Sequence, residues 1–561
     1  MLSLGLVLLA TTSLAPSASA AGFASQVLVY GGTPSGVLAA VTAARAGASV
    51  TLLEPTKHLG GLMSNGLGWT DIGDKSTLGG FTREWFDRVQ RIEGETRGRY
   101  AFAPSSAELA FRQMLGTTKV RVVYDAPLRE SGGVVKDGAR ILSVRTVAGN
   151  EYRAQTFIDA SYTGDLMAQA GVTYRLGREA IAEFGEPLAG ARGGRVILGS
   201  TAGQTMPYLA TPPGPPGSAD DRIQASNYRV CFSSDPSRRV PLAAPLGYDR
   251  DDFTVIDVYL DSLAVLRKEP ASVHWVLSIT PLTDRKYDVN DYGAMSTALP
   301  GLNWTYPEAT YAQRALIDQQ HRRYAKGLFH FLAHDSAVAQ SVRSQMARFG
   351  LCKDEFLDNG HWPRQLYLRE GRRMVGQYVL RQSDLQTKRS KTDIIGIASY
   401  RIDSHFVSRW ADAGRIMAEG TMSAPKLNYA IPYRIMVPNP AEARNLLVPV
   451  AASATHVAQS SLRMEPQYML MGEAAGEAAA LTRSRRIVIT RSNAGAATCG
   501  GLAHARSTAG AVKCGGLTQA GSTATPTSGF VIVGPIDVGK IDVARLQARL
   551  KARGAKLTNP S

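Results

Sequence analysis

The sequence predicts an α/β fold that is organised around one βαβ unit near the N-terminus. Residues Val27–Tyr30 form a short apolar run suited to a buried parallel strand, and a glycine-rich turn follows directly. The alanine-rich run Val37–Ala46 has a helical pattern, Gly47 ends it, and Ser49–Leu53 has the pattern of the next buried strand. This order of elements predicts a Rossmann-like dinucleotide-binding domain.

The turn between the first strand and the helix carries the chemistry of that prediction. Glycines let a backbone approach a pyrophosphate, and the following helix N-terminus offers free N–H groups. An acid at the end of the second strand binds a ribose, and Glu54 lies 18 residues past Gly36. Thr33 stands where the second glycine of the fingerprint is expected. The alternative interpretation is an ordinary βαβ unit that binds no ligand. The motif alone does not distinguish an NAD site from an FAD site. The predicted cofactor-binding residues here are Gly31, Gly32, Thr33, Pro34, Ser35, Gly36 and Glu54.

Bulk composition indicates a globular protein of two domains, because 561 residues can bury a large core. Residues 1–20 combine an apolar run with small residues before Ala21, which predicts a secretory signal peptide; a disordered apolar tail is the alternative. No run is long and uncharged enough to predict a transmembrane segment. We therefore expect a secreted or periplasmic protein.

The formal charge is +16, but lysines and arginines are scattered along the chain, and no nucleic-acid-binding signature accompanies them. A solvated basic surface is the plain interpretation, and attraction to anionic substrates or envelope polymers is the sharper one. The cysteine spacings do not match metal sites, so no metal is expected. Cys499 and Cys514 are candidates for a local disulfide, whereas Cys231 and Cys352 are expected to be unpaired buried thiols.

A second glycine-rich segment follows Glu54. It contains HLGGLMSNGLGWTD from His58 to Asp71, a composition that suits a loop against a flat ligand. Together with the fingerprint ending in Glu-Pro, this segment resembles the FAD-dependent oxidoreductase family whose members are often labelled xanthan-lyase-like, distantly akin to fumarate-reductase-type flavoproteins. The resemblance implies FAD as cofactor, with Gly60 and Gly61 beside it. It also implies a glutathione-reductase type of FAD-binding domain with an inserted α+β substrate domain.

The remainder of the first domain is predicted as helices over residues 81–115 and short strands between residues 120 and 158, which we interpret as a small β insertion. An apolar strand then ends at Asp159, followed by small residues up to Gly164 and Asp165. The resemblance implies that this segment closes over the adenosine half of FAD, with Asp165 near the flavin or its ribityl chain. A strand-to-helix turn capped by Thr163 or Asp165 is the alternative.

The substrate region, residues 166–440, offers several patterns. Residues 307–350 are helical, with His330 and His334 one turn apart on what is more simply a helix face than a metal site. Residues 364–381 have apolar residues at helical spacing among cations, which predicts a basic amphipathic helix. In the β-like run 394–406, Asp403 precedes His405 by two residues, so both side chains share one strand face and the acid can orient the imidazole.

The chain returns to the cofactor domain at residues 441–490. A strand predicted at 445–450 is followed by His456 and Arg463 and then by a helix rich in small residues. The N-terminus of this helix can face the flavin. Gly472 and Ala475 are the predicted cofactor-binding residues of the helix. A core histidine and a salt-bridge arginine are the alternatives. Residues 491–530 hold a tandem repeat offset by 15, predicted as a surface loop, and 531–561 end in a helix capped by Asp542.

These observations predict a flavoenzyme that transfers a hydride between FAD and an organic substrate, such as a sugar-like compound or a secondary metabolite. No second strand–glycine–helix fingerprint is present, which favours an acceptor other than a nicotinamide. His405 or His456 is the expected base and Arg463 the group that stabilises reduced flavin. A polysaccharide lyase and a basic envelope-binding protein with a vestigial flavin fold are the alternatives.

Overall fold

A seven-stranded sheet holds the βαβ unit at its centre in the computed structural model, which describes residues 22–94, 100–387, 389–425, 427–482, 488–490, 529–531 and 537–558. Strand β1 (Gly22–Tyr30) pairs in parallel with β2 (Val50–Leu53) on one side and with β6 (Glu151–Asp159) on the other. The order is β3-β2-β1-β6-β5-β4, and β21 (Leu446–Leu447) also pairs in parallel with β6. The remaining strands are β3 (Arg121–Val123), β4 (Val134–Asp137) and β5 (Arg140–Arg145).

The predicted Rossmann-like α/β fold is therefore confirmed, but the small β insertion predicted between residues 120 and 158 does not include β6. This strand lies beside β1 in the main sheet, from Gly22↔Glu151 to Tyr30↔Asp159. β4 and β5 extend the same sheet as an antiparallel edge. Strand patterns alone do not reveal which neighbour a strand pairs with, because pairing is a long-range contact.

Two helices pack closely over this sheet. In α12 (Glu465–Leu481), a Cβ on Gly472 would lie 2.1 Å from the Ser35 carbonyl oxygen of α1 (Pro34–Arg45). A Cβ on Gly476 would lie 2.2 Å from the Ala39 carbonyl oxygen, so only glycines allow this approach. The flanking helices are α2 (Gly61–Ser64), α3 (Gly80–Ile92), α4 (Pro104–Gly116), α5 (Asp165–Gln169), α11 (His456–Leu462) and α13 (Val543–Ala552). As predicted, Asp542 caps α13 by accepting a hydrogen bond from the Arg545 N–H at 2.9 Å.

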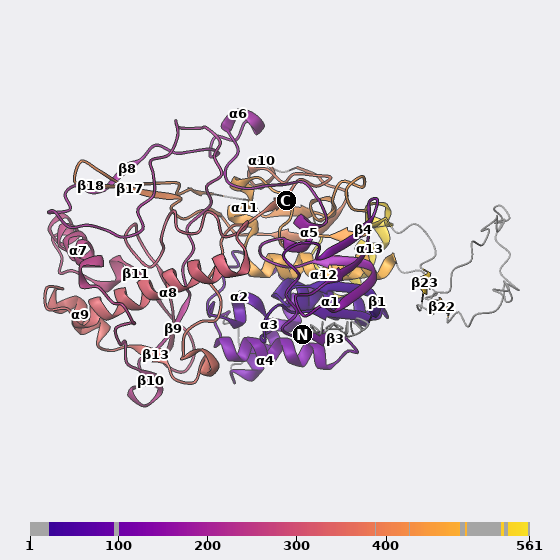
Figure 1. Cartoon of the computed structure of the whole chain (residues 1–561), viewed down its shortest axis with the longest axis horizontal. Helices are drawn as coiled ribbons and strands as arrows, with labels where there is room; N and C mark the ends of the chain where they lie inside the picture. The colour runs from indigo at the N-terminus through magenta and orange to yellow at the C-terminus, as the bar shows by residue number, and fades with distance from the viewer. Residues whose placement is uncertain are drawn as a thin grey trace, which may run out of the picture.

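The other half of the molecule is a five-stranded antiparallel sheet with its own core, on the left of Figure 1. Its order is β10-β13-β9-β12-β11. Helix α8 begins at a capping box on Thr310 beside the first half, where the Tyr311 hydroxyl donates to the Leu128 carbonyl, and runs from there into this half. The elements are β9 (Val230–Ser233), β10 (Arg239–Val240), β11 (Leu277–Pro281), β12 (Lys286–Asp291), β13 (Gly350–Cys352), α7 (Thr254–Arg267), α8 (Tyr311–His334) and α9 (Gln340–Met346).

A disulfide joins Cys231 in β9 to Cys352 in β13. The expectation of two unpaired buried thiols is wrong, because the fold brings two strands together that are 121 residues apart in sequence. The two sulfurs lie in a small apolar cluster with Phe356. The proposed Cys499–Cys514 pair lies outside the described residues.

The substrate region does not form one unit. Residues 380–437 contribute mostly to the core of the cofactor half, whereas the second core draws on residues 198–366 and on Ile416. The minor elements are β7 (Tyr174–Arg175), β8 (Arg195–Leu198), β14 (Arg373–Met374), β15 (Ile394–Ala398), β16 (Ile402–Asp403), β17 (Ser408–Asp412), β18 (Arg415–Glu419), β19 (Ser423–Ala424), β20 (Tyr429–Pro432), β22 (Val488–Thr490), β23 (Gly529–Val531), α6 (Ile181–Phe184) and α10 (Gln382–Gln386).

The predicted amphipathic helix over residues 364–381 is wrong. The segment is mainly irregular and contains only the two-residue strand β14. Arg369 and Arg373 are 2% and 1% exposed, so they are buried and paired rather than displayed on a helix surface. A Cβ on Gly371 would lie 2.9 Å from the Tyr162 carbonyl oxygen, so this segment closely approaches the cofactor half.

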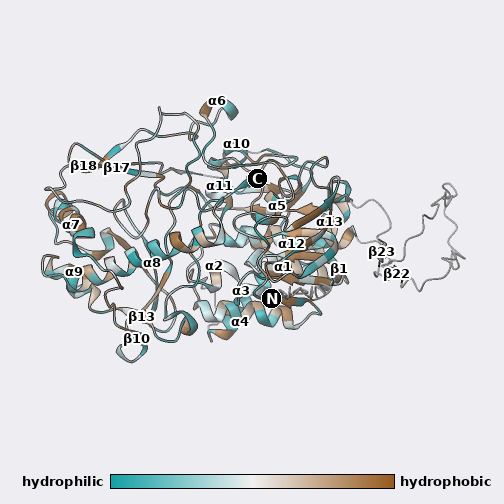
Figure 2. Cartoon of the chain, in the orientation of Figure 1, coloured by the Kyte–Doolittle hydropathy of each residue, from teal (hydrophilic) through white to brown (hydrophobic). Residues whose placement is uncertain are grey.

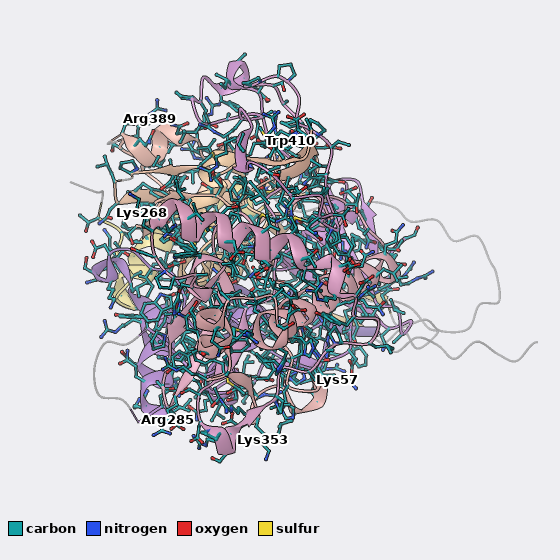
Figure 3. All side chains as sticks on the ribbon, turned by 90° about the vertical axis from the view of Figure 1, so that its left-hand side faces the viewer. Lys57, Lys268, Arg285, Lys353, Arg389 and Trp410 are labelled. Carbon is teal, nitrogen blue, oxygen red and sulfur yellow. A yellow bond between two sulfur atoms is a disulfide. The ribbon has the colours of Figure 1, made fainter. Side chains whose placement is uncertain are left out.

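The surface agrees with a scattered positive charge. Apolar residues gather in the sheet and in α1 and α12 (Figure 2), while Lys57, Lys268, Arg285, Lys353 and Arg389 lie apart from one another around the outline of Figure 3. Within the described residues, no helix is both long and apolar enough to cross a bilayer. The signal peptide predicted at residues 1–20 and most of the repeat segment lie outside the described residues.

Candidate functional site: a cofactor cleft beside a polar cavity

The fingerprint turn has a backbone that only glycine permits. Gly31 has φ +92°, and a Cβ there would lie 3.0 Å from the Ala160 carbonyl carbon. A Cβ on Gly36 would lie 1.9 Å from the Gly31 carbonyl oxygen. The turn is thus folded against the end of β6, and its glycines place no side chains between the backbone and the cleft.

Thr33 replaces the expected glycine for a structural reason. It is the N-cap of α1, and its hydroxyl accepts a hydrogen bond from the Gly36 N–H at 3.2 Å. The same hydroxyl donates to the Ala160 carbonyl at 2.8 Å. The side chain therefore caps the helix and ties the turn to β6.

Glu54 supports the turn as well as facing the cleft. Its Oε2 accepts a hydrogen bond from the Gly32 N–H at 2.7 Å, and its Oε1 accepts one from the Thr56 N–H at 2.7 Å. Burial raises the pKa of this carboxyl, and the hydrogen bonds from Thr56 partly offset that rise. The carboxylate still lines the cleft, where a ribose hydroxyl can reach it.

A cleft of about 540 Å³ begins at this turn and is lined by both halves of the molecule. Five of the predicted cofactor-binding residues line it: Gly31, Thr33, Glu54, Gly61 and Asp165. The others lie behind its wall. They are Gly32, Pro34, Ser35, Gly36, Gly60, Asp159, Gly164, Gly472 and Ala475.

The residues behind the wall hold it in place. Asp159 is fully buried and accepts hydrogen bonds from the Ser161 and Met167 N–H groups, and burial raises its pKa to about 6. Gly164 is the N-cap of α5 in the left-handed region, with φ +64°. Gly60, with φ +91°, packs on Ser64. Gly472 and Ala475 are buried in α12, where Gly472 contacts α1 rather than the cleft.

Asp165 is held by the opposite half of the molecule. Its two oxygens accept hydrogen bonds from Arg314 at 2.8 Å and from Arg372 at 2.9 Å. Burial alone would raise its pKa, but Arg314, Thr163 and Arg372 together outweigh burial and the pKa is lowered. This ion pair closes one side of the cleft.

Unpartnered buried atoms test whether the cleft fits FAD. Asn65 Oδ1 and Asp318 Oδ1 belong to residues that line the cleft, and both atoms are buried without a hydrogen-bond partner within the described structure. Buried polar atoms without partners are uncommon in folded proteins, and ligands commonly satisfy them. Together with the bare glycine turn, the α1 N-terminus and Glu54, they match the phosphate, ribose and polar ring groups of FAD.

Glu465 adds a buried acid at the start of α12. It accepts a hydrogen bond from the Tyr162 hydroxyl at 2.7 Å, and that hydroxyl accepts one from the Leu62 N–H at 3.0 Å. Burial raises the pKa of Glu465 to about 8, so its neutral form is present at pH 7. Its Oε2 is also buried and unpartnered within the described structure.

His58 lies at the Glu54 side of the cleft. Its Nδ1 is 3.2 Å from Glu108 Oε2 and its Nε2 is 2.8 Å from Asp358 Oδ2. Both ring nitrogens are therefore engaged by carboxylates, which disfavours covalent attachment of a flavin at this residue.

A second, polar cavity of about 310 Å³ lies next to the cleft. Gln365 and Leu368 line the cleft, and Tyr367, between them, lines the cavity. Asn65 also lines the cleft, while a Cβ on the adjacent Gly66 would lie 2.4 Å from the carbonyl oxygen of Arg229, a cavity residue. These two segments therefore lie between the cleft and the cavity.

His405 lines the cavity, but its partner differs from the predicted one. Its Nδ1 is 3.0 Å from Asp291 Oδ2, at the end of β12, so the proposed Asp403–His405 pair is wrong. The short strand β16 ends at Asp403, and the alternation that would place both side chains on one face does not continue to His405. Within the described structure, His405 Nε2 has no hydrogen-bond partner.

The charges around this pair favour a neutral imidazole. Burial lowers the pKa of His405, the charge of Arg369 lowers it further, and Asp291 opposes both effects. Burial would raise the pKa of Asp291, but Arg369 at 2.6 Å and His405 outweigh burial and lower it. A carboxylate that accepts the Nδ1 proton leaves Nε2 as the proton acceptor.

Arg463 and His456 occupy different positions. Arg463 lines the cavity and donates to the Tyr367 hydroxyl at 3.3 Å and to the Asp403 carbonyl at 3.1 Å, while its Nε is buried without a partner in the described part of the chain. His456 is 1% exposed, lines neither space, and has its Nδ1 2.8 Å from Glu370 Oε1. We therefore place His456 among the supporting residues.

Sequence reasoning missed Asp291, Arg229 and Arg314. Asp291 is the last residue of β12, Arg229 directly precedes β9, and Arg314 lies in the first turn of α8. The one signal in the sequence for these residues is the number of charged residues in strand-like runs such as KYDVND. A charged side chain in a buried strand needs a partner of opposite charge. The His330 and His334 ring centroids are 4.7 Å apart with the rings tilted by 43°. Among the described residues no cluster of three or more metal-ligating side chains occurs.

The βαβ fingerprint and the cleft define a dinucleotide-binding α/β protein with an adjacent polar site. The family model of the FAD dependent oxidoreductases matches residues 26–491, so the chain belongs to that family. Within this family, a lyase and a vestigial binding protein are not favoured. The search of curated proteins found no match.

Several solved structures resemble parts of the chain at low sequence identity. Thioredoxin reductase from T. acidophilum is 19% identical over 24% of this chain and 34% of its own, with a TM-score of 0.17. A flavin-containing monooxygenase from Stenotrophomonas maltophilia is 19% identical over 29% and 44%, with a TM-score of 0.19. L-proline dehydrogenase from P. horikoshii is 13% identical over 28% and 59%, with a TM-score of 0.22. The matches thus cover between about a third and three fifths of these chains.

Proposed function

We propose that the protein oxidises an alcohol or amine of an organic substrate, with His405 as the base and FAD as the hydride acceptor. The observation that carries this proposal is the Asp291–His405 pair on the wall of a polar cavity beside the cofactor cleft. FAD supplies two-electron hydride chemistry when bound. The substrate loses one O–H or N–H proton to His405 Nε2 and a hydride from the adjacent carbon, which becomes a carbonyl or imine.

The surrounding residues prepare this step. Asp291 holds the ring orientation and keeps the proton on Nδ1, so that Nε2 can accept a proton from the substrate. Arg369 fixes Asp291 from the other side. Arg463, buried next to the cavity, contributes positive charge where negative charge develops in the reaction.

We further propose an electron acceptor other than a nicotinamide, such as oxygen, a quinone or a protein. The support is the single dinucleotide fingerprint in the sequence. Steady-state assays with NAD(P), oxygen and a soluble quinone would test it. Reoxidation of the enzyme by NAD(P) at a catalytic rate would contradict it.

Export to an oxidising compartment is also a proposal. The predicted signal peptide supports it, and so does the Cys231–Cys352 disulfide, because such bonds persist mainly outside reducing compartments. N-terminal sequencing of the exported protein should begin at Ala21. A mature protein that retains residues 1–20 inside the cell would contradict the proposal.

The decisive test is anaerobic bleaching of the flavin by substrate in rapid mixing. His405→Gln should retain the cofactor and lose about 10²–10⁴-fold in the rate of bleaching, the usual contribution of a positioned base. His330→Gln is the matched control, because this half-buried histidine of α8 bonds only the Leu242 carbonyl and lines neither space. Chemical reduction by dithionite should be equal in all three proteins. Bleaching of His405→Gln at the wild-type rate would contradict the proposed role.

A further inference from the structure

The polar cavity has an unusual lining for a site that takes an organic molecule. Ligand pockets are mostly lined by apolar and aromatic side chains. Phe406 is the one lining side chain without a polar group, and Gly293 has no side chain. The other lining residues carry charges, hydroxyls, an amide or, in His405, an imidazole. A substrate with a large apolar body would therefore leave many of these groups without partners.

The cavity is also electrically balanced. Its three arginines are matched by three aspartates, and the burial of His405 keeps that side chain neutral at pH 7. The chain as a whole carries +16, so the balance is local and does not follow from composition. An anionic substrate would gain no net attraction inside the cavity to offset the loss of its hydration. The charged residues are Arg229, Arg401, Arg463, Asp71, Asp291 and Asp403.

Both donors and acceptors remain available on the wall. Asn290 Oδ1 accepts hydrogen bonds from Asn227 and Arg369, which leaves its amide N–H groups as donors. Asp71 lines the cavity, and within the described structure its carboxylate forms no hydrogen bond or ion pair. Hydroxyl groups both donate and accept, so a series of hydroxyls satisfies such a mixed wall.

An aromatic side chain stands at the edge of the cavity. Tyr292 lines it and is 54% exposed, directly after Asp291 of the catalytic pair. An exposed ring beside a polar site offers an apolar surface for the C–H face of a saturated ring. The combination of polar wall and single exposed ring fits a molecule with polar edges and an apolar face.

We propose that the substrate is a neutral polyhydroxylated compound, a sugar or a cyclic polyol, one of whose hydroxyls gives its proton to His405. This inference rests on the proposed function and deepens it. Asp71 and Asn290 bind further hydroxyls, and Tyr292 stacks on the ring. The cavity selects against the uronate of the same sugar, because it offers a carboxylate no net positive charge.

Binding is tested through the absorbance change of the oxidised holoenzyme on addition of ligand, which needs no turnover. The probes are D-glucose, D-galactose and myo-inositol, the uronates D-glucuronate and D-galacturonate, and benzyl alcohol with benzylamine. At least one neutral polyol should saturate the spectral change and bind about tenfold or more tightly than its uronate, a difference of about 1.4 kcal/mol. Tighter binding of a uronate or of a benzyl compound, or no response to any neutral polyol, would overturn the proposal.

The same samples, kept anaerobic, separate this proposal from the proposed function. A polyol that binds without bleaching the flavin supports the substrate class and contradicts the oxidation. Bleaching by benzyl alcohol or benzylamine, with no polyol response, supports the oxidation and overturns the substrate class.

Variants sharpen the charge argument. Asp71→Asn removes one negative charge, so the ratio of uronate to neutral-sugar affinity should rise about tenfold. Asp412→Asn is the control, because this exposed aspartate of β17 pairs with Arg415 and does not line the cavity. Tyr292→Phe should bind sugar like the wild type, and Tyr292→Ala several-fold more weakly. An unchanged ratio in Asp71→Asn would overturn the electrostatic basis of the selectivity.

Discussion

The cofactor cleft and the polar cavity are neighbours that are encoded in different ways. The cleft depends on backbone geometry within one βαβ unit, where a single added Cβ would lie 1.9 Å from a carbonyl oxygen. The cavity depends on side chains from the residue before β9, from β11 and β12, from the segment after β16 and from the end of α11, which meet only in the folded chain. A local motif therefore forms the turn of the cofactor cleft, and long-range packing forms the proposed substrate cavity.

The largest expected effect breaks the cleft alone. Gly36→Ala should abolish flavin binding, because its Cβ cannot be placed beside Gly31 without moving the turn. The measurement is the flavin absorbance per chain of the purified protein. Gly116→Ala is the matched control, since this exposed residue at the end of α4 has open space around it. Full flavin content in Gly36→Ala would show that the turn does not hold the cofactor.

The second prediction breaks the cavity and leaves the cleft intact. The rate of flavin bleaching should rise with pH as His405 loses its proton, with a midpoint below about 6.5, because burial and Arg369 lower its pKa. Asp291→Asn removes the charge that opposes this shift, so the midpoint should move to still lower pH. The plateau rate should fall about 10–100-fold, because the ring loses the partner that fixes its proton. Flavin content should not change. An unmoved midpoint would argue against the pair.

The third prediction concerns the scaffold behind the cavity. Cys231→Ser should lower the thermal midpoint by several degrees, because the native bond closes a loop of 121 residues and such bonds contribute about 2–5 kcal/mol. Cys352→Ser and the double variant should show the same loss, since each removes one bond. Thiol labelling in denaturant should reach these two residues only after reduction. Labelling of both without reductant would contradict the disulfide.

The smallest expected effect lies at the rim of the cavity. The side chain of Arg401 is 58% exposed and 3.4 Å from Asp403, and such surface pairs contribute about 0.2–1 kcal/mol. Arg401→Gln should change KM by less than about fivefold and leave kcat and the thermal midpoint unchanged. Arg463→Met, at a buried wall position, should reduce kcat far more. Equal effects of the two variants would remove the distinction between rim and wall.

This contrast also explains what the sequence could predict. Gly31, Glu54 and the helix between them follow local rules, so the cofactor domain could be predicted together with its ligand. The partner of His405 could not, because Asp291 lies 114 residues away and nothing local marks their approach. The prediction of a helix over residues 364–381 failed for a related reason. Arg369 and Arg373 are cations at helical spacing, but the fold buries them against Asp291 and Glu370.

The visible spectrum of the purified full-length protein, taken before and after acid precipitation, tests the central claim most directly. The account predicts a yellow protein with one flavin per chain and a yellow supernatant after precipitation, because both ring nitrogens of His58 are already engaged. A yellow pellet would contradict non-covalent binding. A colourless protein that cannot be reconstituted with FAD would contradict the assignment of the cleft.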